Sequence, residues 1–317
     1  MLDRLSRETV IGAAVAVGIA VLLIATGLSS SLVLGLVNGA VYGLMALGLV
    51  LVYKSSGIFN FAQGEFGTVA VYVLWLLLER GVPYILAIVL ALGTAAAFGV
   101  LVERVVIRPL FDAPRVILLV ATAGVFLLAL SIQVWFGGFL IRQMRPLAPR
   151  LDRLSILGVN VSDQRMLLIV VLVGLGIGLA YFFNRTTLGL AVISASQEPT
   201  ATELVGISVK RVSALIWGLA AFFGGVVGVL NAPIDGSFSP AFLTRTALIP
   251  GFTAAVLGGM TSLPGAFVGG AIVGVAQNVA LSAGIFSSIP GPDAVMVFTI
   301  LVVVLVIRPQ GLLGKAA

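Results

Sequence analysis

The sequence predicts an all-α, polytopic membrane protein with about eight to ten membrane helices. Three observations predict this class. Of the 317 residues, 60% are hydrophobic, only 9% are charged, and the mean hydropathy is +1.20. A soluble domain carries roughly 25% charged residues, so this chain has too little polar surface to cover a water-exposed exterior. Several apolar runs also approach the roughly 20 residues that a helix needs to cross a bilayer.

Ten apolar runs are the predicted spans, within a single domain over 1–317. Seven are long and lie at 10–28, 32–53, 59–78, 84–107, 116–136, 166–184 and 212–231. Three are Gly-rich and more interrupted, at 247–260, 265–283 and 294–307. Two of these are short for a full span, so eight or nine helices remain alternatives. The run 10–28 lacks a closing A-x-A-like site, so it is interpreted as a retained, extra N-terminal helix rather than a signal peptide.

The basic residues predict which loops face the cytoplasm, because cytoplasmic loops carry an excess of Lys and Arg. Ten spans divide the 18 basic residues into two sets. The larger set is Arg4, Arg7, Lys54, Arg104, Arg108, Arg115, Arg185, Lys210, Arg211, Arg308 and Lys315. The smaller set is Arg80, Arg142, Arg145, Arg150, Arg153, Arg165 and Arg245. We therefore expect the larger set and both termini in the cytoplasm. The Arg-rich connection 137–165 argues the other way, and it is expected to form a small external cap.

Several residue types and motifs are missing from the chain. It has no Cys and no His, so disulfides, thiolate metal sites and imidazole general bases are excluded. It has no G-x-x-x-x-G-K-[ST] phosphate loop and no H-E-x-x-H or G-x-S-x-G motif. The basic residues are spread rather than clustered, which argues against nucleic-acid binding. The sequence predicts no catalytic residue, bound cofactor or metal on this chain.

A polar stretch at 185–208 interrupts the apolar chain between two predicted spans. Its length accommodates about two short helices, with Thr187 as the N-cap of the first and Pro199 at the first position of the second. Gly206 is a natural C-terminal stop. We interpret the stretch as a helical elbow outside the bilayer that docks on a soluble motor subunit; a solvated loop with some helix is the alternative. The residues assigned to this coupling region are Arg185, Gly189, Gln197, Glu198, Thr202, Glu203 and Gly206.

The stretch KSSGIFNFAQGEF at 54–66 places three polar residues between two spans. Asn60 and Gln63 have the spacing of a capping box, and Glu65 falls in the first turns of the following helix. A carboxyl group at membrane depth is costly and therefore a functional candidate. The residues alone leave two interpretations open, a translocation path that includes Asn60, Gln63 and Glu65, and a plain cytoplasmic turn with a capped helix start.

The Gly-rich stretch 254–280 predicts close helix packing. Its pairs Gly265/Gly269 and Gly270/Gly274 have small-xxx-small spacing. Gln277 and Asn278 are amides that need partners if buried, and they are further candidates for the path. Residues 231–240 are expected to form a polar bend after the span 212–231.

Four ordered blocks resemble one transporter family. They are NGAVYGLMALGLVLVYKSSGIFNFAQGEF, RTTLGLAVISASQEPTATELVGISVKRV, AAVLGGMTSLPGAFVGGAIVGVAQ and VVLVIRPQGLLG. Together they span about 35–314, and their order is similar to that of branched-chain amino acid ABC permeases, the LivH-like more than the LivM-like type. The chain departs from the family pattern at Gln63, where His is common, and around Leu190 and Ile193, where basic residues are common.

The resemblance implies a permease subunit of a binding-protein-dependent importer in the cytoplasmic (inner) membrane. It implies a second, LivM-like permease, two ATP-binding subunits that hold ATP and Mg²⁺, and an extracytoplasmic solute-binding protein. The segment matching 185–208 is then the part that contacts the ATPase. The resemblance also implies that the segment matching Asn60–Glu65 lies by the translocation path, and on this ground we assign Asn60, Gln63 and Glu65 to the path. Related permeases on this scaffold carry urea, short amides and other small solutes, so these remain alternatives. A standalone ion-coupled carrier is a further alternative, disfavoured because Glu65 is the one good intramembrane acidic candidate.

Overall fold

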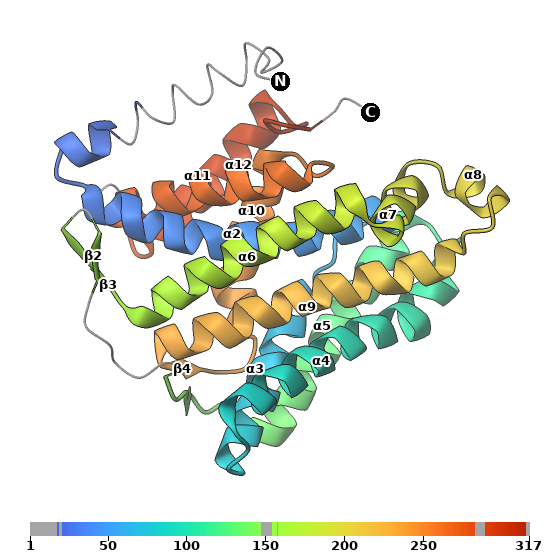
Figure 1. Cartoon of the computed structure of the whole chain (residues 1–317), viewed down its shortest axis with the longest axis horizontal. Helices are drawn as coiled ribbons and strands as arrows, with labels where there is room; N and C mark the ends of the chain where they lie inside the picture. The colour runs from blue at the N-terminus through green and yellow to red at the C-terminus, as the bar shows by residue number, and fades with distance from the viewer. Residues whose placement is uncertain (1–17, 19–20, 147–153, 157, 283–288, 315–317) are drawn as a thin grey trace.

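The computed structural model describes residues 18, 21–146, 154–156, 158–282 and 289–314. Helices dominate these residues and run roughly side by side along the long axis of the molecule (Figure 1). Six of the described helices are long and apolar enough to cross a membrane. The described residues also include a shorter apolar helix, Pro292–Ile307. The predicted helical membrane fold is therefore confirmed, whereas the predicted span 10–28 lies largely outside the described residues.

Two helices form the centre of the bundle. α2 (Ser29–Ser56) and α9 (Val209–Asp235) are largely buried along their most apolar stretches. A helix that is apolar on all sides is stable only where neighbours or lipid surround it, and both of these pack against other helices. α9 packs against α3 (Gln63–Glu79), α4 (Tyr84–Val102) and α2. α2 packs most closely on α11 (Leu263–Ser282).

The outer helices bury one side and expose apolar residues on the other. α4 continues through a π-helical turn η1 (Glu103–Ile107) and a 3₁₀ turn η2 (Arg108–Leu110) into α5 (Arg115–Gly137). α6 (Asp163–Arg185) follows the connection 137–165. Exposed side chains on these helices include Val120, Leu128, Val173 and Ile177, which suits contact with lipid or with another apolar surface.

The C-terminal third contains interrupted segments. α9 continues through Pro233 to Asp235 and ends at Gly236, so the bend expected from residue 231 begins five residues later. The chain re-enters the bundle through β4 (Ser237–Phe238), the π-helical turn η3 (Thr244–Leu248) and α10 (Ile249–Gly258). After α11, α12 (Pro292–Ile307) completes the described helices.

Two small antiparallel ribbons lie at one end of the bundle. β1 (Arg142–Gln143) pairs with β4, and β2 (Leu154–Ile156) pairs with β3 (Val159–Val161). The expected cap at 137–165 therefore exists in part as strands, while 147–153 lies outside the described residues. At the opposite end lie two short helices, α7 (Thr187–Gln197) and α8 (Pro199–Leu204) (Figure 1).

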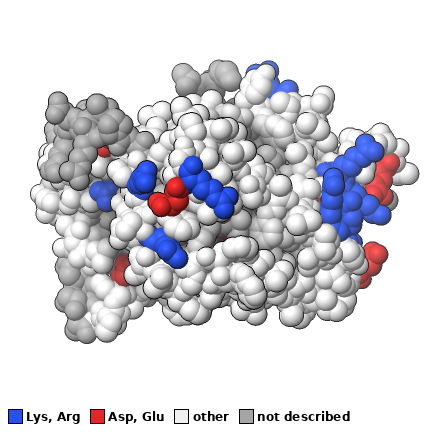
Figure 2. All heavy atoms as spheres, turned by 90° about the horizontal axis from the view of Figure 1, so that it is seen from below, with Lys and Arg blue, Asp and Glu red and all other residues white. Residues whose placement is uncertain are grey.

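At each of these two ends, charged side chains make contacts with residues that are distant along the chain. Near α7, Arg108 Nη2 donates to the carbonyl of Lys210 at 3.0 Å. At the ribbon end, the hydroxyl of Tyr84 donates to the carbonyl of Arg145 at 3.1 Å, and Arg145 approaches Glu79 at 3.9 Å. Figure 2 shows Lys and Arg gathered mainly in two places with uncharged surface between them, and a further small group at the upper edge. This pattern is that of a helical bundle whose apolar belt lies between two polar ends.

Candidate functional site: the elbow and the buried polar cluster

The elbow consists of the two short helices α7 and α8, as the sequence predicts. Thr186, not Thr187, is the N-cap of α7, because its hydroxyl oxygen accepts from the N–H of Gly189 at 3.0 Å. The sequence signal was ambiguous here since the two threonines are adjacent. Pro199 is the first residue of α8, and Gly206 follows its end with φ of +83°, as expected.

The inner face of α7 anchors the elbow to the bundle. Ala191, Val192 and Ala195 are buried, and α7 contacts α2, α6 and α9. Gly189 lies against the last turn of α6, where a Cβ atom would come within 2.8 Å of Phe183 Cα. These contacts make α7 an extension of the bundle rather than a loose loop.

Thr202 on α8 is buried instead of facing outwards. It is 3% exposed, and its hydroxyl donates to the carbonyl of Glu198 at 2.8 Å. Its assignment to the coupling region stays a prediction, and a buried side chain at this position contributes to the shape of the elbow rather than to an outer contact.

The outer surface of the elbow combines charge with exposed apolar side chains. Leu204 is 85% exposed and Val205 is 74% exposed. Glu198 and Glu203 are exposed beside them, as is Arg185 at the end of α6; Gln197 ends α7. Exposed apolar residues with a charged rim mark an interaction surface. Sequence reasoning missed Leu204 and Val205, because an apolar pair before a helix stop is also typical of an inward-facing end.

The polar cluster lies where α3 begins inside the bundle. Asn60, Gln63 and Glu65 are each 0% exposed, so they are not in a solvated turn. The helix has Ala62 as its N-cap, with no side-chain cap, and the predicted capping box is therefore wrong. Asn60 instead donates through Nδ2 to Gln63 Oε1 at 3.3 Å and accepts from the N–H of Ala62 at 3.0 Å. The amide of Gln63 donates to the carbonyl of Ala220 at 2.8 Å, which ties α3 to α9.

The carboxyl group of Glu65 is held by two side chains that sequence reasoning missed. Gln133 Nε2 on α5 donates to one carboxyl oxygen at 2.5 Å, and the hydroxyl of Thr244 on η3 donates to the other at 2.6 Å. Gln133 Oε1 accepts from the N–H of Ala241 at 3.0 Å. Glu65 makes no ion pair among the described residues. The one available signal was Gln133 itself, an amide within the apolar run 116–136.

Gln277 and Asn278 lie on α11 and have other partners. The hydroxyl of Tyr42 donates to Gln277 Oε1 at 2.6 Å, and Gln277 Nε2 donates to Asp293 at 3.3 Å. Asn278 donates to the carbonyl of Gly274 at 2.9 Å. The expected close packing of α11 is present as well, since a Cβ atom on Gly35 or Gly39 of α2 would meet α11 backbone atoms within 2.7 Å.

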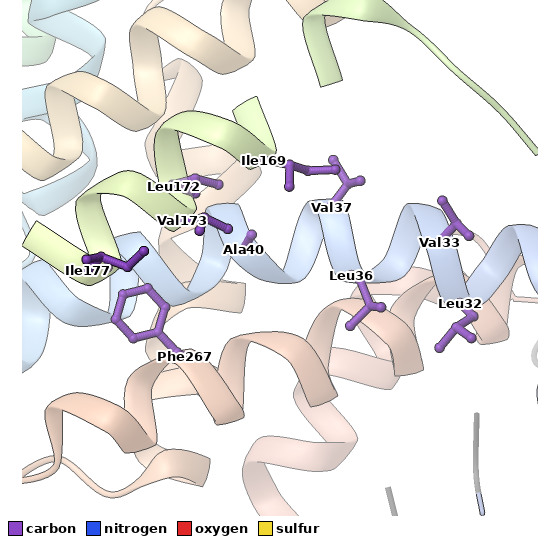
Figure 3. Close-up of a pocket in the computed structure, with 11 residues that line it drawn as sticks. Leu32, Val33, Leu36, Val37, Ala40, Ile169, Leu172, Val173, Ile177 and Phe267 are labelled. Atoms are coloured by element: carbon purple, nitrogen blue, oxygen red, sulfur yellow. The ribbon is translucent and has the colours of Figure 1, made fainter. Parts of the chain in front are cut away.

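An apolar groove lies between α2, α6 and α11 (Figure 3). Its volume is about 640 Å³, and its lining includes Leu36, Ala40, Ile177 and Phe267. A groove without charged or hydrogen-bonding side chains does not suit a polar solute, and it suits an acyl chain or an apolar helix face. Across the described residues, no group of three or more acidic side chains is placed to hold a metal ion.

The fold and these features define a class: a multi-pass helical membrane protein. Comparison with known proteins gives the family. The chain belongs to the family described as branched-chain amino acid transport system / permease component, whose model matches residues 31–307.

Curated relatives agree with this assignment over nearly their whole length. The chain is 33% identical over 296 residues to the high-affinity branched-chain amino acid transport system permease protein BraD of Pseudomonas aeruginosa, covering 90% of this chain and 95% of BraD. It is 30% identical over 304 residues to the permease protein LivH of Escherichia coli K12, and the alignment covers 89% of this chain and 94% of LivH. Among solved structures, PsaBC from Streptococcus pneumoniae in complex with Fab has a similar fold, with a TM-score of 0.50 and 12% sequence identity. The superposition covers 92% of this chain and 97% of the matched chain.

Proposed function

We propose that this chain is the permease subunit of an ATP-driven importer for branched-chain or related amino acids in the cytoplasmic membrane. The observation that carries the proposal is the family match over 31–307, joined to relatives whose own names state branched-chain amino acid transport. A phosphate loop is missing from the whole sequence, so the energy source is placed on partner subunits. The proposed partners are a second, LivM-like permease, two ATP-binding subunits and an extracytoplasmic solute-binding protein.

The elbow is proposed to face the cytoplasm and to receive the ATP-binding subunit. The end of the bundle that carries it holds Lys54, Arg108 and Lys210, which belong to the larger basic set. An excess of Lys and Arg favours the cytoplasmic side. In this orientation Leu204 and Val205 enter a cleft of the partner, while Glu198 and Glu203 contribute to its charged rim.

Coupling follows from how the elbow is attached. The inner face of α7 packs on α2, α6 and α9, so a displacement of the elbow moves helices of the central bundle with it. ATP binding closes the partner subunits, and the two elbows of the assembled transporter then act as rigid levers that switch access from one side to the other.

The translocation path is proposed to run between this chain and the second permease. Asn60, Gln63 and Glu65 support its wall from within, because they hold the interrupted start of α3 against α5, α9 and η3. Gln277 does the same for α11 through Tyr42 on α2 and Asp293 on α12, whereas the hydrogen bond of Asn278 stays within α11. Non-helical backbone at membrane depth is stable only where protein or a water-filled cavity satisfies its polar groups, and these side chains provide part of that.

The test is reconstitution in liposomes with the ATP-binding subunits, the second permease and the solute-binding protein. Uptake of radiolabelled leucine should require ATP and all four kinds of subunit. Leucine uptake by this chain alone would contradict the proposal, and so would an assembled transporter that hydrolyses ATP in response to a different solute but not to branched-chain amino acids.

A further inference from the structure

α5 is joined to the rest of the chain along one stripe. Its buried residues fall at helical spacing and are Leu118, Thr122, Val125, Ala129, Gln133 and Gly137. The remaining face is apolar and exposed, as at Leu127 and Leu128. Two members of the stripe are polar, and each has at least one partner in a part of the chain that is not regular α-helix. Thr122 accepts from the N–H of Phe61, in the non-helical approach to α3, at 3.3 Å.

Gln133 is the second polar member, and it bridges two elements. Its Nε2 donates to Glu65 on α3, and its Oε1 accepts from the N–H of Ala241. The orientation of the amide is determined by these partners, because a flipped amide would set oxygen against oxygen and N–H against N–H. Gln133 is 3% exposed, so each lost hydrogen bond would leave a buried polar group unpaired.

The backbone that Gln133 holds is strained. Ala241 has φ of +58°, and it is the one non-glycine residue with positive φ within the part of the chain that the structure describes. Such a conformation persists only where the surroundings stabilise it, and it tends to occur at functional elements. Three residues later the chain enters the π-helical turn η3, whose first residue, Thr244, donates to the same carboxyl group of Glu65.

We infer that Gln133 is a positioning residue that latches α5 directly to the strained turn at Ala241 and, through the carboxyl group of Glu65, to Thr244 at the start of η3. The latch determines how far α5 stands from the core, and its release lets α5 and the segment 241–248 move together. Glu65 serves as a hydrogen-bond acceptor in this latch and its charge is dispensable. The role in the transport cycle rests on the proposed function, whereas the structural latch does not.

The experiment uses the assembled transporter in nanodiscs and compares variants at positions 65 and 133. Gln133→Leu removes both hydrogen bonds at similar volume. Gln133→Glu alone sets two carboxyl groups against each other. Adding Glu65→Gln to it restores every partner: the new amide at 65 donates to the new carboxyl at 133, which still accepts from Ala241, while Thr244 still donates to position 65. Gln143→Leu, at an exposed glutamine, is the matched control.

The readouts are deuterium exchange in peptides covering 115–137 and 237–248, and solute moved per ATP hydrolysed. Leaving buried hydrogen-bonding groups unpaired should speed exchange by about ten- to a hundredfold. We expect this for Gln133→Leu and for Gln133→Glu alone, together with less solute per ATP. The double variant should recover wild-type exchange and wild-type solute moved per ATP. Glu65→Gln alone should stay close to wild type in both readouts. Gln143→Leu should change neither readout.

Unchanged exchange in Gln133→Leu would overturn the latch. So would failure of the double variant to recover, because that result would assign the effect to the charge of Glu65. If Gln133→Leu does not assemble, Thr122→Val takes its place, because Thr122 is the other polar contact of α5. This variant should raise deuterium exchange in the peptide 115–137 and not in 237–248. Unchanged exchange in 115–137 would count against the inference. Wild-type transporter without ATP-driven uptake would overturn the proposed function but leave the exchange comparison readable.

Discussion

Gly39 on α2 and Gly270 on α11 lie in backbone contact. A Cβ atom on Gly39 would stand 2.7 Å from the carbonyl oxygen of Gly270 and 2.8 Å from Cα of Ala271. Atoms this close overlap, so α2 and α11 approach each other only because both positions lack a side chain. The contact joins the central helix to a helix more than 200 residues further along the chain.

Gly39→Ala should therefore destabilise the protein, because the methyl group forces the two helices apart. Overpacking of this kind costs about 1–3 kcal/mol. The matched control is Gly93→Ala on α4, where a Cβ atom meets no heavy atom of this chain within 4 Å. Thermal unfolding in detergent should show a lower midpoint for Gly39→Ala and an unchanged or slightly higher one for Gly93→Ala. Equal midpoints would show that the helices are not in backbone contact.

The N-cap of α7 distinguishes two adjacent threonines. Thr186→Val removes the hydroxyl that accepts from Gly189, which should cost about 1 kcal/mol and speed local opening of α7 about fivefold. Thr187→Val, at an exposed position, is the isosteric control. Deuterium exchange in a peptide covering 187–197 measures the opening. Faster exchange in Thr187→Val and not in Thr186→Val would reverse the assignment of the cap.

Charge reversal on the elbow should uncouple ATP hydrolysis from uptake. Glu198→Lys and Glu203→Lys place the wrong charge on the rim of the proposed docking surface, and like-charge contacts at an interface cost several kcal/mol. Membrane insertion should be unaffected because both side chains are exposed. Asp112→Lys, at an exposed position between η2 and α5, is the control. Solute moved per ATP is the measurement, and normal coupling in both elbow variants would remove their assigned role.

Two ion pairs of this chain should differ sharply in their contribution to stability. Glu103 is 0% exposed, and Arg108 donates to its two carboxyl oxygens at 2.7 and 3.2 Å. Glu103→Ala removes the buried partner of Arg108, whose own side chain is 31% exposed, and the loss of these charged hydrogen bonds should cost about 1–3 kcal/mol. Glu79→Ala breaks the exposed pair with Arg145 and should stay within about 0.5 kcal/mol of wild type. Denaturant unfolding compares the two variants. A similar loss in both would mean that burial does not decide the strength of these pairs.

Several features were predictable from the sequence because their signals are local. The apolar runs predicted most helices, since a bilayer-spanning helix is a matter of length and hydropathy. Pro199 and Gly206 predicted the boundaries of α8, since each acts on its own backbone. The starts of α3 and α7 were predicted wrongly because several neighbouring residues could each serve as the N-cap. Which of them does so depends on the path of the chain, and tertiary contacts decide that path.

The partners of the buried polar groups were not predictable. Glu65 bonds to Gln133, 68 residues away, and to Thr244, 179 residues away. No spacing rule connects such positions, and the choice depends on which helix faces pack together. The same holds for the outward position of Leu204 and Val205, whose apolar character alone predicts burial.

The sequence by itself determined that this is a helical membrane protein with a polar elbow, because hydropathy, helix caps and breakers act over a few residues. Only the tertiary structure decided that Asn60, Gln63 and Glu65 lie in the interior, that Gln133 joins α5 to them, and that glycines of α2 and α11 meet. Those relationships arise when helices distant along the chain pack together, since each buried polar group must then find a donor or acceptor among whatever packing brings beside it.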